Sequence, residues 1–395
     1  MRHGNPYRSC GRIVLGSLVA ALVLLTGLNG AYAQVEQFQP ERLKDGSSLP
    51  AALVPLYVSD FSLAHLMDGR VYILDASNGH YAGALDAGYA GQFALSPDGR
   101  QAYIAATYLA RHTHGERTDV LEIYDTSTLR LSGEVVLPKK HVQSLFTKEL
   151  LRLSMDGRYL FVQNATPATS VTVVDLAQRK LLAEVSSPGC WALYPSQTTS
   201  LRFSMLCGDG SVNTITLNED GSVASRAASR KFFDSDSAPL YINAVNDAEH
   251  YYFLSFAGKL TQVTLSAQQP VIGETLDLVP QKLQPQGWRP GGYQLMALHR
   301  ASARLFIAMH RDGKEGSHKS PAQEIWEFDL HSGQLLTRRK ASNAVSLSVN
   351  QGAPAYLYAL DGRSNQIHAY DMLHQLRQVY VTDPVGDAPT QVDTP

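Results

Sequence analysis

Short apolar runs separated by polar turns recur along most of this chain. The stretch 153–175, LSMDGRYLFVQNATPATSVTVVD, contains two such runs, 159–162 and 171–174, each next to a polar turn. Asp favours turns because it can bond its own backbone, and Gly because it accepts positive φ. Tyr, Phe, Leu and Val suit a half-buried pleated surface. The pattern predicts a β-hairpin with both of its turns.

The chain repeats this unit. The turn and first run recur as SPDGR at 96–100 followed by AYIAA at 102–106. The second run, ending in Asp, recurs at 71–75, 120–125, 325–329 and 367–371. The closing Asp residues at 75, 125 and 175 are 50 residues apart, and those at 329 and 371 are 42 apart. A period of this length, with several short strands per unit and no helical periodicity, is typical of a β-propeller. The alternative is a pair of β-sandwiches whose similarities arise by chance.

The N-terminus has the features of an export signal. Three arginines precede an apolar run over 13–28, and Ala31-Tyr32-Ala33 supplies the small residues that a signal peptidase needs. We therefore expect residues 1–33 to be a cleaved signal peptide of the ordinary secretory route, and the mature protein to be periplasmic. An uncleaved membrane anchor is the alternative. The 362 residues that remain are enough for about seven blades of roughly 50 residues, which predicts an all-β, seven-bladed β-propeller.

The mature chain divides into three parts by composition. Residues 34–50 are polar and are expected to form an N-terminal arm, and 51–380 to form the propeller. The tail over 381–395 is rich in Pro, Asp and Thr, and we expect it to be disordered. Loss of the three signal arginines takes the formal net charge from −2 to −5. With no basic stripe left, the mature chain does not fit nucleic-acid binding.

Two cysteines survive removal of the signal. Cys190 and Cys207 form an even pair in an oxidising compartment, which predicts a disulfide. A bridge closing a loop of this length stabilises the folded state by about 3 kcal/mol in the chain-entropy account. A redox-active pair is the alternative, but the close Cys-x-x-Cys spacing is missing.

Four long insertions interrupt the repeat, at 107–119, 138–150, 280–293 and 310–321. Insertions of this kind lie on the exposed face or rim of a scaffold, where partners dock. His112 with His114, and His310 with His318, could be metal ligands, but neither pair has the further ligands at a recognisable spacing. We therefore predict no metal site. The sequence also lacks a nucleophile elbow and a phosphate-binding glycine loop.

Several longer motifs resemble one family. They are NATPATS at 164–170, GCW at 189–191, CGDG at 207–210, WRPGG at 288–292 and DGKEGSHK at 312–319. Together they resemble the heavy subunit of the tryptophan tryptophylquinone amine dehydrogenases. The stretch 318–326 looks more like aromatic amine dehydrogenase than methylamine dehydrogenase. The likeness runs from about Tyr57 to Tyr370.

The resemblance implies a periplasmic α2β2 enzyme that oxidises primary amines to aldehyde and ammonia. Electrons would pass to a blue copper protein of the azurin or amicyanin type. The heavy chain of this family is a seven-bladed propeller with a disulfide, which Cys190 and Cys207 match. The tryptophan tryptophylquinone and the catalytic residues belong to a small, cysteine-rich light subunit. No catalytic residue and no cofactor are therefore expected in this chain.

The family's heavy chain places one aromatic residue at the mouth of the substrate channel, shortly after the first strand. The matching position here is near Leu63, with Phe61 two residues earlier. In an extended segment Phe61, Leu63 and His65 point the same way, so we expect all three on the face toward the channel and the light subunit. Because leucine stands where the family has an aromatic, the resemblance does not fix the preferred amine.

Two other functions remain open from the sequence. The first is a free-standing secreted propeller that binds a ligand or partner without redox chemistry. The second is a propeller hydrolase or lactonase, for which the sequence offers no metal or nucleophile constellation.

Overall fold

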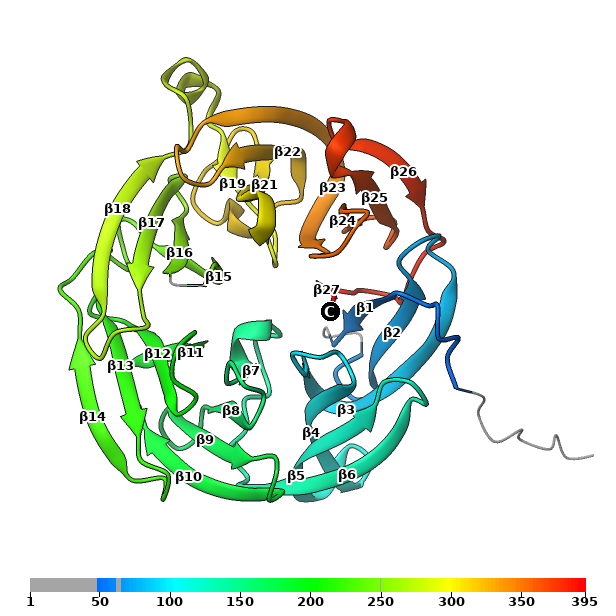
Figure 1. The fold of residues 1–395 in the computed structure, drawn as a ribbon, viewed down its shortest axis with the longest axis vertical. Helices are drawn as coiled ribbons and strands as arrows, with labels where there is room; N and C mark the ends of the chain where they lie inside the picture. Colours follow the sequence, from blue (N-terminus) through cyan, green and yellow to red (C-terminus); the bar gives the residue numbers. More distant parts are fainter. Residues whose placement is uncertain (1–47, 62–64, 249) are drawn as a thin grey trace, which may run out of the picture. The chain divides into compact units, whose positions relative to one another are not determined.

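Antiparallel sheets of short strands follow one another around a ring in sequence order (Figure 1). The computed structural model describes residues 48–61, 65–248 and 250–395. The predicted signal peptide and most of the predicted arm lie outside these residues. The described residues belong to one compact unit, 47–395. This arrangement is that of a β-propeller, as the repeated hairpins predict.

The strands pair mainly with their neighbours in the chain. The first sheet contains β27 (Gln391–Asp393), β1 (Pro55–Asp60), β2 (Gly69–Asp75), β3 (Tyr81–Leu95), β4 (Gln101–Arg111), β5 (His114–Asp125) and β6 (Arg130–Leu137), in that order. Three four-stranded sheets follow: β7 (Leu151–Leu153), β8 (Tyr159–Asn164), β9 (Ser170–Asp175) and β10 (Lys180–Ser186); β11 (Cys190–Pro195), β12 (Arg202–Cys207), β13 (Val212–Leu217) and β14 (Val223–Ala228); and β15 (Leu240–Asn246), β16 (His250–Ser255), β17 (Lys259–Thr264) and β18 (Val271–Asp277).

The last sheet contains β19 (Arg289–Pro290), β20 (Met296–His299), β21 (Arg304–His310), β22 (Ala322–Asp329), β23 (Leu335–Val349), β24 (Tyr356–Asp361), β25 (Ile367–Asp371) and β26 (Arg377–Val381). Helices in the described part of the chain are short 3-10 turns at Lys148–Leu150, Gln281–Gln286, Arg300–Ser302, Ser317–Lys319 and Met372–His374. Among these residues no helix has the length and apolar character that crossing a bilayer requires.

The strands β3 and β23 each change partner half-way along. β3 pairs with β2 from Tyr81 to Gly88 and with β4 from Tyr89 onward. β23 pairs with β22 over its first part and with β24 from Ala344 onward. Each long strand therefore ends one group of antiparallel strands and begins the next.

The polar turns have the chemistry that the sequence predicts. In the turn after Ser96, the Asp98 carboxylate accepts bonds from the Ser96 hydroxyl (2.6 Å) and the Arg100 amide (3.1 Å). The turn after Ser154 repeats this pattern with Asp156. Both turns place Gly at positive φ, at 69° in each case, where a side chain would be strained.

The core lies between neighbouring sheets. One cluster joins Phe161 and Val173 of the β7–β10 sheet to Phe203 and Met205 of the next sheet, with the two Phe rings 4.9 Å apart. Burying side chains of this size stabilises the fold by about 1.5–3 kcal/mol each. Similar clusters connect the other neighbouring sheets, so the ring is held by contacts between blades.

The C-terminal tail is ordered, which corrects the expectation of disorder over 381–395. β27 pairs with β1, with Val58 opposite Val392, and the Val392 side chain is fully buried. The Gln294 amide donates to the Val392 carbonyl at 2.7 Å. The polar composition of the tail does not indicate this order, because the order comes from backbone pairing with β1 and from burial of Val392.

Candidate functional site

The four long insertions lie on one face of the ring. In an antiparallel meander, alternate connections lie at the same end of the sheet. The insertions fall between β4 and β5, β6 and β7, β18 and β20, and β21 and β22, which are all second-to-third or fourth-to-first connections of their groups. We call this side the insertion face and define it by 107–119, 138–150, 280–293 and 310–321. The short Asp turns after β3 and β7 lie on the opposite face.

The first two insertions are joined through one buried carboxylate. Residues 107–119 form the extended end of the β4–β5 hairpin, with Thr107 opposite Asp119. Asp119 is 0% exposed and accepts two bonds from Arg117, both of 2.6 Å, and one from the Thr107 hydroxyl at 2.8 Å. It also accepts a hydrogen bond from the backbone N–H of His141 at 3.2 Å, and Arg117 donates to the His141 carbonyl. This network fixes the 138–150 connection to the hairpin.

His141 lies beneath this network and is fully buried. Both of its ring nitrogens lack a hydrogen-bond partner. Burial lowers the pKa of His141 to about 4; the Asp119 charge opposes the shift, and the Arg117 charge adds to it. The histidine is therefore neutral at pH 7.

The third and fourth insertions are joined by a stack of arginine and tryptophan side chains. Trp288 and Trp326 have ring centroids 5.1 Å apart. The Arg338 guanidinium lies 5.0 Å from Trp288 and 4.9 Å from Trp326, and Arg311 lies over Trp288 at 5.0 Å. Such contacts stabilise by about 0.5–2 kcal/mol each. The backbone amide of Gly292 also donates to the His318 carbonyl, which links the two segments directly.

The Trp288–Trp326 pair does not fit a tryptophan-derived quinone site. Both side chains are fully buried, so an amine has no access to them. Their indole N–H groups donate to Gln286 and Glu324, at 3.0 and 2.8 Å, and the rings are covered by arginine. The contacts of Trp288 with Trp326 and Arg311 hold the two insertions in place. They leave no exposed indole that could react with an amine.

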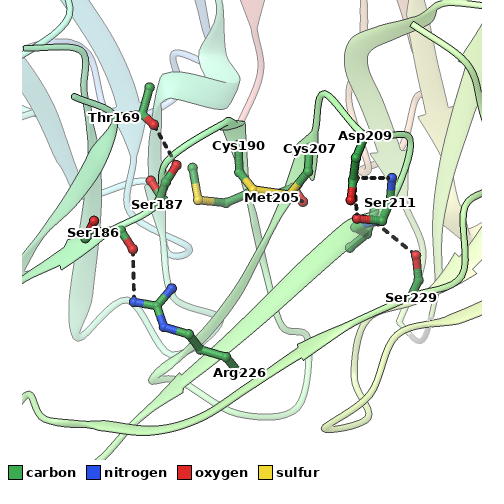
Figure 2. The surroundings of a disulfide bond; sticks show 11 residues. Thr169, Ser186, Ser187, Cys190, Met205, Cys207, Asp209, Ser211, Arg226 and Ser229 are labelled. Carbon is green, nitrogen blue, oxygen red and sulfur yellow. Dashed lines mark hydrogen bonds between the residues drawn. A yellow bond between two sulfur atoms is a disulfide. The ribbon is translucent and has the colours of Figure 1, made fainter.

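The predicted disulfide is confirmed, and it also lies on the insertion face. Cys190 begins β11 and Cys207 ends β12, where the two residues are cross-strand partners (Figure 2). The Gly208 amide donates to the Gly189 carbonyl beside the bridge. On either side of it, Thr169 donates to the Ser187 carbonyl and the Asp209 carboxylate accepts from Ser211 (Figure 2).

The structure describes two of the three predicted channel residues, Phe61 and His65. Phe61 is 0% exposed and packs in the core with Tyr57 and Phe93, so its expected place on a partner-facing surface is wrong. The expected strand alternation does not reach Phe61, because β1 ends at Asp60. Leu63 lies outside the described residues.

His65 is partly exposed on the connection between β1 and β2, which belongs to the insertion face by its position in the sheet. Its Nε2 lies 2.8 Å from Oδ2 of Asp387, and its Nδ1 lies 3.1 Å from Oδ1 of Asp68. The bond to Asp387 raises the pKa of His65. The role of His65 at a channel mouth stays a prediction.

The histidine pairs are not joined into a metal shell. His112, at φ 61°, lies at the tip of the β4–β5 hairpin, and the His114 ring contacts the Thr113 hydroxyl. Across residues 48–61, 65–248 and 250–395, no group of three or more His, Cys, Asp or Glu could hold a metal ion. No local sequence pattern indicates the Asp119 network, because its partners come from both insertions and lie up to 24 residues apart.

Comparison with known proteins decides the family. The methylamine dehydrogenase heavy chain (MADH) family matches residues 54–394. The chain belongs to this family. The methylamine dehydrogenase heavy chain of Methylophilus methylotrophus is 28% identical over 402 residues, covering 99% of this chain and 96% of that one. The corresponding chain of Paracoccus versutus is 26% identical and covers 82% of this chain and 75% of its own length.

Solved structures outside the heavy-chain family share the fold. A putative 6-phosphogluconolactonase from Bacteroides uniformis gives a TM-score of 0.59 at 12% identity, covering 89% of this chain and 99% of that one. One from Bacteroides fragilis gives 0.56 at 11% identity, covering 90% and 99%. At these identities the likeness concerns the fold alone and does not revive the lactonase alternative.

Proposed function

We propose that this chain is the heavy subunit of a periplasmic quinoprotein amine dehydrogenase. The observation that carries the proposal is the heavy-chain family match over 54–394, supported by the Cys190–Cys207 disulfide. The complete enzyme is an α2β2 assembly that oxidises a primary amine to aldehyde and ammonia. It passes electrons to a blue copper protein. Tryptophan tryptophylquinone in the light subunit supplies the reactive carbonyl and takes up the electrons.

The proposal includes a seven-bladed propeller. The partner changes within β3 and β23 support it, because each divides a larger sheet into two groups of antiparallel strands. If each of these groups is one blade, they and the sheets β7–β10, β11–β14 and β15–β18 make up the seven blades that we propose.

The insertion face is the surface that we assign to the light subunit. Three of its insertions present a large apolar side chain to solvent: Tyr108, Leu145 (51% exposed) and Tyr293 (40% exposed). Exposed apolar and aromatic groups rimmed by polar residues mark protein interfaces. The Asp119 network and the Trp288–Arg338 stack hold this surface in one conformation before the partner arrives, which lowers the entropy cost of association.

Co-expression with the light subunit and its maturation factors tests the proposal. The two chains should co-purify and oxidise primary amines, whereas this chain alone should show neither activity nor quinone absorbance. Leu145→Asp combined with Tyr293→Asp should weaken assembly, since it places charge in an apolar interface. Leu373→Asp is the matched control, because Leu373 is 79% exposed in the connection between β25 and β26, on the opposite face.

Two results would contradict the proposed function. Amine oxidation by this chain in isolation would overturn the assignment of the quinone to the partner. A stable chain that never binds a light subunit would favour the free-standing propeller.

The preferred amine and the electron acceptor also belong to the proposal. We propose a role for Leu63 at the channel mouth, where the size of its side chain would help to set which amines enter. Leu63→Phe should then change the ratio of kcat/KM between a small and a bulky amine by about ten-fold, as a methylene-scale change in an apolar pocket does. One common slowing for all amines would assign Leu63 to packing.

A further inference from the structure

A hollow of about 470 Å³ opens on the insertion face between three connections. Leu240 and Tyr241 begin β15, Phe256 follows β16, and Glu315 and His318 come from the 310–321 insertion. This volume lies within the range of small-molecule sites, roughly 300–1,000 Å³. The hollow is therefore large enough to enclose most of a small organic ligand.

Two aromatic rings form its walls. The Tyr241 and Phe256 centroids lie 6.4 Å apart with their planes at 57°. The Tyr241 hydroxyl donates to the Pro290 carbonyl at 2.6 Å, which fixes the ring, and burial raises the pKa of this tyrosine so that it stays neutral. Each ring face carries partial negative charge and attracts a cation placed within about 6 Å of its centroid.

Carboxylates give the hollow its charge. Asp236 and Glu315 line it, and no lysine or arginine lines it with them. Within the described residues, no ion pair is formed by either carboxylate. Two apolar ring faces beside two carboxylates without cationic partners are the chemistry that recognises an ammonium group on an apolar body.

We propose that this hollow binds a small organic ammonium ion, with the cationic nitrogen near the carboxylates and the apolar body between Tyr241 and Phe256. The proposal rests on residues of this chain alone, and it requires the hollow to stay open when the light subunit covers the rest of the insertion face. A rigid pocket wall supports it, because Tyr241 is tied to the 280–293 insertion and is not free to close the space.

Isothermal titration of the full mature chain with benzyltrimethylammonium chloride at low ionic strength tests the proposal. This probe has no N–H and is not oxidised as a primary amine, so its binding is independent of catalysis. We expect saturable binding of one ion per chain, at least about ten-fold tighter than that of the neutral comparator benzyl alcohol. Tyr241→Leu should weaken binding about five-fold or more, whereas Tyr241→Phe keeps the ring and should bind like the native chain.

The charged side is tested with Asp236→Asn combined with Glu315→Gln. This variant should bind the probe more weakly and lose most of the salt dependence. Asp220→Asn, in an exposed turn between β13 and β14, is the matched control and should bind normally. Equal affinity for the ammonium ion and benzyl alcohol, or full binding by Tyr241→Leu, would overturn the proposal. Loss of binding on assembly with the light subunit would assign the hollow to a partner side chain and would also overturn it.

Discussion

Replacement of His141 by leucine should flatten the acid side of the stability profile. His141 has a pKa of about 4 in the folded chain, against an ordinary value of 6.5. A histidine with a depressed pKa contributes stability at high pH. This stability is lost as pH falls, because the unfolded chain takes up the proton first. The loss begins near pH 6.5 and is complete near pH 4.

The size of the effect follows from the two pKa values. Protonation of His141 in the unfolded chain lowers the free energy of unfolding by about 2 kcal/mol at pH 5 relative to pH 7, and by about 3 kcal/mol at pH 4. His141→Leu removes this component. It also removes two buried ring nitrogens that have no partner, so its stability at pH 7 should be equal or higher.

Urea unfolding of the native chain and the variant at pH 7, 6 and 5 measures the difference. The two curves should diverge by about 2 kcal/mol between pH 7 and pH 5. His331→Leu, which changes an exposed histidine between β22 and β23, is the control and should follow the native curve. Parallel profiles for the native chain and His141→Leu, within about 0.5 kcal/mol, would refute the reasoning.

Three further changes test other parts of the structure. Asp119→Asn leaves Arg117 without its buried partner and should cost about 3 kcal/mol; amides of the two insertions that it joins should exchange about 100-fold faster, and unchanged exchange would contradict the network. Cys190→Ser should lower stability by about 3 kcal/mol and expose one thiol to labelling, whereas two reactive thiols in the native chain would contradict the bridge. Deletion of residues 390–395 removes Val392 and the strand that covers β1, and should cost about 4 kcal/mol in urea unfolding; native stability after deletion would show that β27 is dispensable.

Local chemistry explains which features could be predicted. The turns around Asp98 and Asp156 follow from three to five neighbouring residues, and their bonds are as expected. The insertions were visible as interruptions of the repeat. Their position on one face follows from the strand order, because alternate connections of an antiparallel sheet lie at the same end. The sequence was therefore a good guide to the scaffold.

The features that were predicted wrongly or missed depend mostly on contacts between distant segments of the chain. The tail over 381–395 was expected to be disordered because its composition is polar, but its partner strand β1 lies more than 300 residues earlier. Phe61 was placed by strand alternation beyond the point where the strand ends. The hollow beside Tyr241 gathers three connections whose proximity no local pattern indicates.

The pairing of β27 with β1 makes the fold sensitive to its own completeness. Until the last residues join, β1 presents an unpaired edge, and open edges of this kind are templates for aggregation. A chain without β27 would keep that edge of β1 unpaired. The stability of the first sheet is thus coupled to a segment more than 300 residues away in the chain.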